Sequence, residues 1–255
     1  MKYFKMKAVL FRQDNIATDV YSMIVDAPEI AQRARPGQFV NCYSADGSRL
    51  LPRPISICDI DRFNGFVRLV YRKVGKGTAE FSNLRAGDKI SIIGPLGNGY
   101  TLRDKKRAIL VGGGIGIPPL LALARELTCE KTIVLGFRDE EFLSEEFYRC
   151  GTVYKSSDAG NIGIHGTVMD AIEEYKISGD VIYACGPRPM LSAIQAYALE
   201  HNIEAQLSLE ERMACGVGAC LACVCQTSSV DEHSQVKNKR VCKEGPVFDA
   251  REVVF

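Results

Sequence analysis

The pattern of apolar and polar positions divides the chain into three segments. Over residues 1–102, short runs of apolar and β-branched residues alternate with turn signals such as Asn64-Gly65. In the run 67–72, Val67, Leu69 and Tyr71 face one side of a strand and the intervening residues face the other. Short strands at this spacing predict an antiparallel β-barrel.

The second segment, residues 103–205, alternates strands with helices. Apolar runs predict buried strands at residues 108–111, 132–135 and 181–184. Proline suits the first position of a helix, so Pro118 and Pro119 predict a helix start after the first of these strands. After the third strand, apolar residues at helical spacing predict another helix: Met190, Leu191, Ile194, Tyr197 and Ala198. This βαβ rhythm predicts a Rossmann-like parallel sheet with helices on both faces.

The third segment, residues 206–255, carries a distinctive cysteine spacing. Cys215, Cys220 and Cys223 form a C-x4-C-x2-C run, and Cys242 follows at a distance. This is the plant-type spacing of 2Fe–2S proteins, and thiolates are soft ligands that suit iron and sulfide. The sequence therefore predicts that these four residues hold a 2Fe–2S cluster in a small C-terminal domain, and that the chain moves single electrons.

Other interpretations of the cysteines remain open on spacing alone. Zinc also takes four thiolates, although structural zinc sites usually use two short Cys-x-x-Cys knuckles. Disulfides would imply an oxidising compartment, for which the sequence offers no sign. Cys225 is an alternative to Cys223 as a ligand, but we interpret it as a spare thiol. Eighteen residues separate Cys223 from Cys242, and their polar composition predicts an exposed excursion with a turn or hairpin.

Composition and charge narrow the classes of partner. The chain has 255 residues, 46 % of them hydrophobic and 25 % charged, with a formal net charge of +1. Such a balance gives no electrostatic case for nucleic acid or an anionic membrane. No apolar run approaches the ~18 residues of a membrane span, and the first residues lack the apolar segment of a signal peptide. We therefore expect a cytoplasmic protein whose ten cysteines are reduced thiols or metal ligands.

Four short motifs are candidates for nucleotide binding. Gly113, Gly114, Gly116 and Pro119 lie between a predicted strand and a helix, where small residues let a pyrophosphate approach backbone N–H groups. Arg53 to Ser56 offers a guanidinium fork and a hydroxyl, and Gly77 and Thr78 add a second small-residue turn. Cys185, Gly186 and Pro187 follow a strand, at the edge where open α/β sheets bind ligands. Taken singly, each motif also fits an ordinary turn or core position without a ligand.

In this order the motifs identify a family. Arg53-Pro54-Ile55-Ser56, Gly75-Lys76-Gly77-Thr78, the glycine turn and Cys185-Gly186-Pro187 resemble the ferredoxin–NADP reductase superfamily. The tail, from Glu211-Arg212-Met213-Ala214-Cys215 to Val241-Cys242-Lys243-Glu244-Gly245-Pro246, resembles the electron-transfer subunits of dihydroorotate dehydrogenase type B. The resemblance covers essentially the whole chain.

The resemblance implies specific cofactor sites. It implies FAD contacts in the barrel, NAD contacts in the second domain, and ligation of the 2Fe–2S cluster by the four cysteines. The residues implied for FAD are Arg53, Pro54, Ile55, Ser56, Val70, Tyr71, Arg72, Gly77 and Thr78, and those for NAD are Gly113, Gly114, Gly116, Pro119, Cys185, Gly186 and Pro187. It assigns no catalytic residue, and we assign none to His165, His201 or His233.

The implied activity is electron transfer in pyrimidine (UMP) biosynthesis. A catalytic partner subunit would oxidise dihydroorotate on FMN, and electrons would pass through the cluster and FAD to NAD⁺, making the chain the orotate reductase (NADH) component. The resemblance further implies a heterotetramer with two copies of each subunit. Carboxylates in the run Gly136-Phe-Arg-Asp-Glu-Glu favour NAD over NADP, because they would repel a 2′-phosphate.

Two alternative functions differ in what they predict. A related electron-bifurcating or sulfide-linked ferredoxin–NAD(P) reductase subunit would share the fold, but these relatives often carry Asp where this chain has Cys215. A redox- or ligand-sensing module would have no turnover and would purify without flavin.

Overall fold

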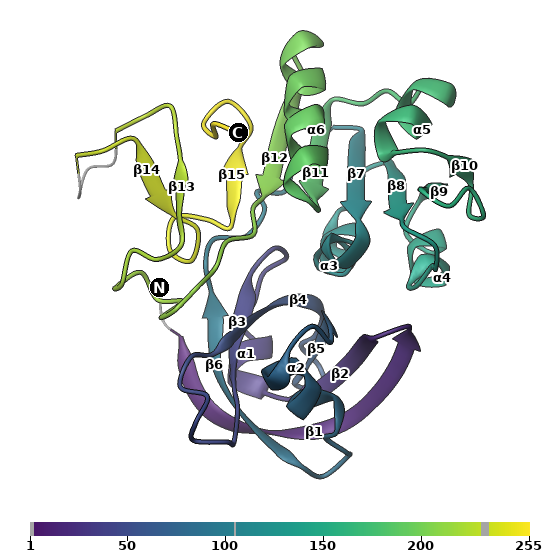
Figure 1. The fold of residues 1–255 in the computed structure, drawn as a ribbon. Coiled ribbons are helices and arrows are strands. Elements are labelled where there is room, and N and C mark those ends of the chain that lie inside the picture. The colour runs from purple at the N-terminus through teal and green to yellow at the C-terminus, as the bar shows by residue number, and fades with distance from the viewer. Residues whose placement is uncertain (1–2, 105, 231–234) are drawn as a thin grey trace.

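The first segment forms a closed antiparallel barrel, as predicted. The computed structural model describes residues 3–104, 106–230 and 235–255. The barrel lies at the bottom of Figure 1, and Val67, Leu69 and Tyr71 point into its core, which confirms the predicted strand face. Its strands, in order around the barrel, are β1 (Phe4–Ala17), β2 (Val20–Asp26), β5 (Phe66–Arg72), β4 (Arg53–Asp61), β3 (Phe39–Tyr43) and β6 (Lys89–Leu96).

Two short helices belong to the barrel segment. Helix α1 (Pro28–Ala31) follows β2, and its Ile30 and Ala31 are buried in the barrel core. Helix α2 (Lys76–Ser82) connects β5 to β6 and buries Phe81 in the same core. Because α2 starts directly after β5, it places a small-residue turn beside the strands that carry the predicted flavin motifs.

The second segment forms the predicted parallel sheet, extended by one antiparallel strand. Its order is β10 (Ile164–His165), β9 (Thr152–Ser157), β8 (Lys131–Phe137), β7 (Ala108–Gly113), β11 (Val181–Cys185), β12 (Glu204–Ser208) and β15 (Val247–Asp249). From β7 the chain builds outward to β8 and β9, then returns to place β11 and β12 on the other side of β7. The strand order therefore reverses between β7 and β11, and such a switch point is where open α/β sheets bind ligands.

Helices cover both faces of this sheet. Alternate residues of β7 point to opposite sides, so Leu110 packs with the face that carries α3 and Val111 with the face that carries α5 and α6. The α3 face also contacts the barrel. The helical elements are η1 (Gly114–Gly116, a 3-10 turn), α3 (Pro119–Glu126), α4 (Ser144–Tyr148), α5 (Val168–Glu174) and α6 (Arg188–Glu200). Helices α3 and α6 begin close to the predicted positions.

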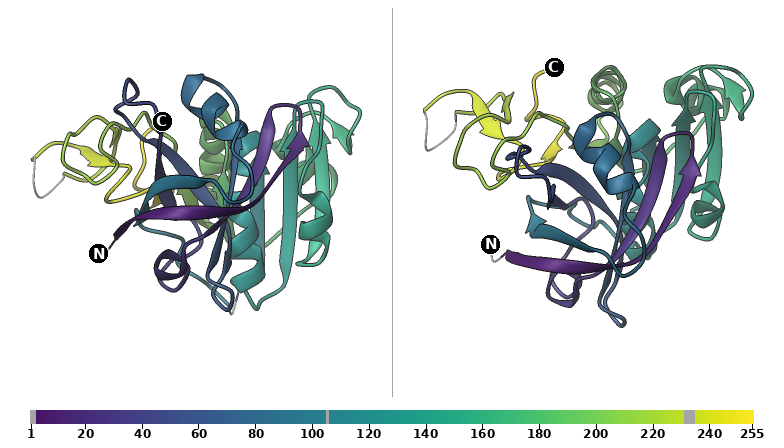
Figure 2. Two further views of the ribbon diagram at one scale, coloured as in Figure 1. Left: turned by 90° about the horizontal axis from the view of Figure 1, so that it is seen from below. Right: turned by 60° about the horizontal axis from the view of Figure 1, so that its bottom comes forward.

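The cysteine-rich tail lies against both other parts. It contains a hairpin of β13 (Val224–Gln226) and β14 (Asn238–Arg240), which lies within the polar stretch, where a turn or hairpin was predicted. Residues 231–234 of this stretch lie outside the described residues. Cys223 and Cys242 pack with Phe39 of the barrel, while β15 joins the sheet beside β12. Figure 2 shows the yellow-green tail beside the barrel and the sheet from two further directions.

Ion pairs connect the barrel to the α/β sheet. Arg68 of β5 contacts both carboxylate oxygens of Glu146 in α4, at 2.7 and 2.8 Å. Arg125 of α3 contacts the same carboxylate at 2.8 Å and also pairs with Asp59 of β4. Around these polar contacts, Val70 and Tyr100 are buried against the α3 face of the sheet. The barrel and the sheet are therefore held at one relative orientation by both apolar and charged contacts.

No helix in the described ranges is long and apolar enough to cross a membrane.

Candidate functional site

The two motifs predicted to bind FAD meet on the barrel surface. Arg53 begins β4, and Gly77 lies in the first turn of α2. A Cβ on Gly77 would lie 2.1 Å from Arg53 Nε, so the guanidinium rests directly on the glycine. Thr78 shapes the turn, because its Oγ1 accepts hydrogen bonds from the N–H groups of Val74 at 2.9 Å and Gly75 at 3.1 Å. A half-buried guanidinium fork over a small-residue turn fits the diphosphate of FAD.

The remaining predicted flavin residues lie on the neighbouring strands with different exposures. Pro54 and Arg72 are exposed, Ser56 is half-buried, and Ile55 is buried in the barrel core. Tyr71 points into the barrel, where its hydroxyl donates to Gln13 Oε1 at 3.0 Å and burial raises its pKa. Tyr71 therefore presents only its main chain to the barrel surface. Their contacts with FAD stay a prediction.

The glycine turn and the Cys185 loop form one structure at the switch point. Gly112 and Cys185 are register partners at the ends of β7 and β11. A Cβ on Gly116 would lie 2.4 Å from the carbonyl oxygen of Cys185, and one on Gly113 would lie 2.5 Å from Met190 Sδ. Only glycine allows this close approach. The sequence motifs that predict the NAD site are thus brought together.

One glycine of this turn faces open space. Gly114 has a φ of +52°, which favours glycine, and no atom lies within 4 Å of where its Cβ would be. Gly114 begins the 3-10 turn η1, which contacts β5, so the glycine turn lies beside the strand that carries Val70 to Arg72. Open backbone next to the predicted flavin strand fits a nicotinamide nucleotide that must reach the flavin.

Cys185 is a neutral thiol in this environment. Burial raises its pKa to about 12, with an opposing contribution from a hydrogen bond to Ser208. A thiol with this pKa is protonated throughout the physiological range and does not serve as a base or nucleophile there. Its position beside Gly186 fits a role in orienting the nicotinamide by packing.

We expect Cys185→Ala to change NADH oxidation only a few-fold and to leave its pH profile unchanged between about pH 6 and 9. The reason is that the thiol does not titrate in this range. The measurement is kcat and KM for NADH-dependent dye reduction across that pH range, with Cys42→Ala as a control at a buried cysteine in the barrel core. Loss of a pH inflection in Cys185→Ala alone would show instead that the thiol ionises during turnover.

The four predicted cluster cysteines fall into two pairs in space. The thiols of Cys215 and Cys220 interact with each other, and so do those of Cys223 and Cys242. In the parts of the chain that the structure describes, no three Cys, His, Asp or Glu side chains surround a single metal-sized position. A 2Fe–2S cluster takes two cysteines on each of two irons, so two pairs suit it. A structural zinc ion would instead need four donors around one point.

Backbone N–H groups point at the sulfurs and favour their thiolate forms. Val217 N and Ala219 N lie 3.4 and 3.3 Å from Cys215 Sγ, and Cys242 N lies 3.4 Å from Cys223 Sγ. Partial burial opposes ionisation of Cys215, yet these donors, together with the backbone and side chain of Cys220, bring its pKa down to about 7. The Cys242 thiol and backbone donors lower the pKa of Cys223 to about 6. Thiolates that already accept N–H hydrogen bonds are ready ligands for iron.

Arg240 of the tail and Asn98 of the barrel segment hold the two ligand loops in place. Arg240 donates from Nη1 to the carbonyl of Gly218 at 2.9 Å and pairs with Glu244, so it joins the first loop to the second. Asn98, from the barrel segment, donates to the carbonyls of Lys243 at 3.1 Å and Glu244 at 2.9 Å.

Comparison with known proteins identifies this arrangement. A family model described as the iron–sulfur cluster binding domain of dihydroorotate dehydrogenase B matches residues 210–254. The dihydroorotate dehydrogenase B (NAD(+)) electron transfer subunit of Caldanaerobacter subterraneus subsp. tengcongensis is 41 % identical over 253 residues, covering 99 % of both chains. The subunit of the same name from Geobacillus sp. (strain WCH70) is 43 % identical over the full length of both. This chain belongs to that family of electron transfer subunits.

Solved structures agree with the family assignment. A structure of an NADH-dependent reduced ferredoxin–NADP oxidoreductase, described in connection with flavin-based electron bifurcation, matches with a TM-score of 0.87 at 30 % identity. The match covers 97 % of this chain and 89 % of that one. The ferredoxin reductase of carbazole 1,9a-dioxygenase shares the fold, with a TM-score of 0.65 at 20 % identity over 80 % of this chain and 67 % of that one. For this electron transfer subunit, the predicted 2Fe–2S cluster, FAD and NAD are thereby confirmed as the cofactor set, and the subunit name implies a catalytic partner.

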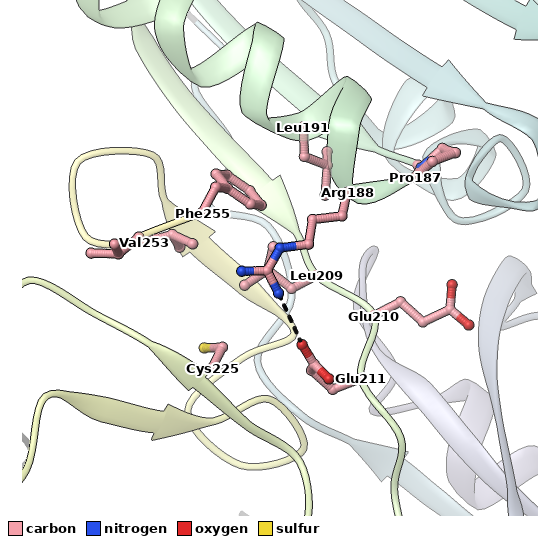
Figure 3. Close-up of a pocket in the computed structure, with 11 residues that line it drawn as sticks. Pro187, Arg188, Leu191, Leu209, Glu210, Glu211, Cys225, Val253 and Phe255 are labelled. Atoms are coloured by element: carbon pink, nitrogen blue, oxygen red, sulfur yellow. Dashed lines mark ion pairs between the residues drawn. The ribbon is translucent and has the colours of Figure 1, made fainter.

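Cys225 lines a pocket that also includes Gly186 and Pro187 of the predicted NAD site. It is 8 % exposed, and burial raises its pKa to about 11, so it lacks the ionised character of Cys215 and Cys223. The pocket has a volume of about 140 Å³ and lies between the tail and the start of α6. In Figure 3, Arg188 extends from α6 across this pocket toward Glu211, with 3.8 Å between Nη1 and Oε1. This placement agrees with the interpretation of Cys225 as a spare thiol.

Sequence reasoning missed the side chains that hold the cluster loops in place, two of them from the barrel segment and one from the tail itself. These residues, Asn41, Asn98 and Arg240, belong to no sequence motif. Each donates a hydrogen bond to a backbone carbonyl of a loop that the cysteine spacing had identified. The glycines of the cysteine run were the available signal. Gly216 has a φ of +66°, and a Cβ there would lie 2.3 Å from Asn41 Nδ2, so a partner side chain close to this loop was to be expected.

Proposed function

We propose that this chain carries electrons from a dihydroorotate-oxidising, FMN-containing catalytic subunit to NAD⁺ in pyrimidine biosynthesis, in an assembly with two copies of each subunit. The observation that supports it best is the linear arrangement of the three sites. The cysteine pairs lie against the outer side of β3, the flavin motifs lie on β4 and β5, and β5 contacts the NAD turn. In this proposal residues 1–102 bind FAD, residues 103–205 bind NAD, and residues 206–255 hold the cluster.

Each part of the chain has a defined task in this function. When bound, the cluster supplies one-electron transfer, the flavin exchanges one or two electrons, and NAD⁺ accepts a hydride. Cys215, Cys220, Cys223 and Cys242 would hold the irons. Arg53 would bind the FAD diphosphate over Gly77, and the open backbone at Gly114 would admit the nicotinamide nucleotide.

The exposed end of the cysteine run is suited to face the partner. Cys220 and Leu221 are exposed, whereas Cys223 and Cys242 are buried against the barrel. The pair formed by Cys215 and Cys220 would therefore lie toward the catalytic subunit, and the buried pair toward the flavin. Electrons would enter on the exposed side and leave through the barrel.

The function is tested by reconstitution with the catalytic subunit. The complex should reduce NAD⁺ with dihydroorotate as donor, and it should reduce orotate with NADH. The catalytic subunit alone should not reduce NAD⁺. A complex that purifies with FAD and iron but couples only ferredoxin to nicotinamide would contradict the proposal.

The similarity to the electron-bifurcating structure supports a second candidate, an NAD(P)-linked ferredoxin reductase subunit. Its identity of 30 % is below the 41–43 % of the two subunits compared above. Cys215, with its inward N–H donors, offers a full thiolate set, which favours the dihydroorotate-linked function. Reduction of ferredoxin by NADH without dihydroorotate would favour the second candidate.

We expect at least a tenfold preference for NADH over NADPH in kcat/KM, and a smaller preference after Asp139→Asn. Glu140 accepts a hydrogen bond from Thr18 N at 2.8 Å, and Glu141 pairs with Lys155 at 2.8 Å. The exposed Asp139 carboxylate has no hydrogen bond or ion pair among the described residues, so it is the one available to a ribose 2′-hydroxyl. Steady-state kinetics with both nucleotides check this. Glu141→Gln is the control and should keep the preference; equal turnover of both nucleotides by the unmodified protein would contradict it.

A further inference from the structure

Strand β3 of the barrel separates the flavin strand from the cluster loops. Its side chains alternate, so Val40 and Cys42 point into the barrel core while Phe39 packs outside it with Cys223 and Cys242. Asn41 lies between the two inward residues and therefore points outward. On its other edge β3 pairs with β4, where Asn41 is the register partner of Pro54 in the flavin motif.

The Asn41 side chain is fully enclosed between the barrel and the first cluster loop. It is 0 % exposed, and its Nδ2 donates to the carbonyl of Cys215 at 3.0 Å. Gly216 packs directly on the amide, since a Cβ there would lie 2.3 Å from Nδ2. The contact joins residues that are 174 positions apart in the sequence. The amide thus fixes the loop that carries one predicted iron ligand to the strand beside the flavin motif.

The other end of the same amide is unsatisfied. Asn41 Oδ1 is buried and has no hydrogen-bond partner among the described residues. Buried polar atoms without a hydrogen-bond partner are rare in native proteins. If this position only had to be filled, an apolar side chain of similar size would serve. The Asn41 amide also interacts with the neighbouring Tyr43, so its N–H donors serve both the Cys215 carbonyl and Tyr43. A polar side chain at this cost indicates that its donors have a task beside the first cluster loop.

We propose that Asn41 is a positioning residue for Cys215 that raises the reduction potential of the cluster relative to the flavin. The inference rests on the proposed cluster site. Reduction adds one negative charge to the cluster, and the positive end of the Asn41 amide dipole points toward the Cys215 loop. In a dry site such a dipole stabilises the more negative, reduced form, and outer-shell hydrogen bonds are known to tune cluster potentials.

The test uses the full chain with its cofactors, in Asn41→Asp, Asn41→Leu and Asn41→Ser forms. Asp and Leu are close in size to Asn; Asp introduces negative charge and Leu removes the donor. The cluster potential is measured by electron paramagnetic resonance during an anaerobic redox titration, and the flavin potential by absorbance in the same samples. We expect Asn41→Asp to lower the cluster potential by a tenfold change in its one-electron equilibrium, ~59 mV, and Asn41→Leu to lower it less. The flavin potential should move far less in both.

Asn98→Leu is the matched control. Asn98 also donates its amide from the barrel segment to the tail, but to the carbonyls of Lys243 and Glu244, which are not predicted ligands. Its substitution should lower the cluster potential much less than Asn41→Leu does, because Asn98 contacts no predicted ligand residue. An equal shift in Asn98→Leu and Asn41→Leu would attribute the effect to looser docking of the tail and overturn the proposal. Asn41→Ser decides the matter if the other changes impair folding, because it removes the amide but keeps a small polar side chain. It should lower the cluster potential in the same direction as Asn41→Leu, and an unchanged potential would overturn the proposal.

Different results would contradict the proposed cluster site and the proposed role of Asn41. A wild-type chain without iron, or one that keeps its cluster after Cys215→Ser, would overturn the proposed cluster site and the role of Asn41 with it. A normal cluster whose potential and resonance spectrum are the same in wild type and in every Asn41 variant would overturn the role of Asn41 alone.

Discussion

Replacing Cys223 by serine is expected to remove the cluster and stop electron delivery from the partner subunit. Cys223 pairs with Cys242 in the buried half of the site, and it accepts an N–H hydrogen bond that favours the thiolate. A serine hydroxyl is a poor replacement for a soft thiolate on iron. Dihydroorotate-dependent NAD⁺ reduction should fall by more than the ~10–100-fold typical of outer-shell changes. NADH-dependent dye reduction through FAD should remain, because neither nucleotide site contacts Cys223.

Cys225→Ser provides the matched control for this experiment. It changes a buried cysteine two positions away, in strand β13, whose thiol has a raised pKa. Iron and sulfide analysis, together with visible absorbance, should show a complete cluster in Cys225→Ser and none in Cys223→Ser. The reverse result would mean that Cys225 is the ligand and that the C-x2-C spacing misled the assignment.

Local periodicity was sufficient to predict the elements that bury one face. The alternation at Val67, Leu69 and Tyr71 matched the barrel strand, and the prolines before α3 marked its start, because both signals depend only on neighbouring residues. Strand β15 had no such signal. It is three residues long and forms by pairing antiparallel with β12, whose residues lie about forty positions earlier in the chain. Such a strand is determined by the sheet strand it pairs with, which is distant in sequence, and not by its own pattern of apolar residues.

The same limit applies to the site. The cysteine spacing predicts a set of four ligands because a cluster imposes distances that short loops must satisfy. Asn41 carries no spacing signal, since its task depends on how the barrel and the tail pack together. The contact between Arg53 and Gly77 was only partly predictable. Both motifs were recognised separately in the sequence, but only the fold shows that the Arg53 guanidinium rests on Gly77.

That contact leads to the second large effect, in which Gly77→Ala is expected to deplete the protein of FAD. The new methyl group would lie 2.1 Å from Arg53 Nε, so the guanidinium must leave its position. Hydrogen bonds between charged groups contribute about 1.5–3 kcal/mol, so losing one corresponds to roughly 10–100-fold weaker FAD binding. Flavin content after purification and a titration of the apoprotein with FAD measure this.

Gly75→Ala is the control at the other glycine of the same turn. No atom lies within 4 Å of where its Cβ would be, so FAD binding should be retained. Gly77→Ala itself should not destabilise the fold, because Gly77 lies within α2, where alanine is the better helix former. Thermal unfolding of the apoprotein checks that the loss of flavin is not a loss of structure.

A double-mutant cycle identifies the cause of the Gly77→Ala effect. If the methyl group acts by displacing Arg53, it should have no further effect once Arg53→Ala has removed the guanidinium. The two single variants and the double variant should then bind FAD with similar affinity, whereas independent effects would multiply. A double variant that binds FAD much more weakly than either single variant would show that Gly77 contacts the cofactor itself. In that case the diphosphate would contact both the α2 turn and the Arg53 fork.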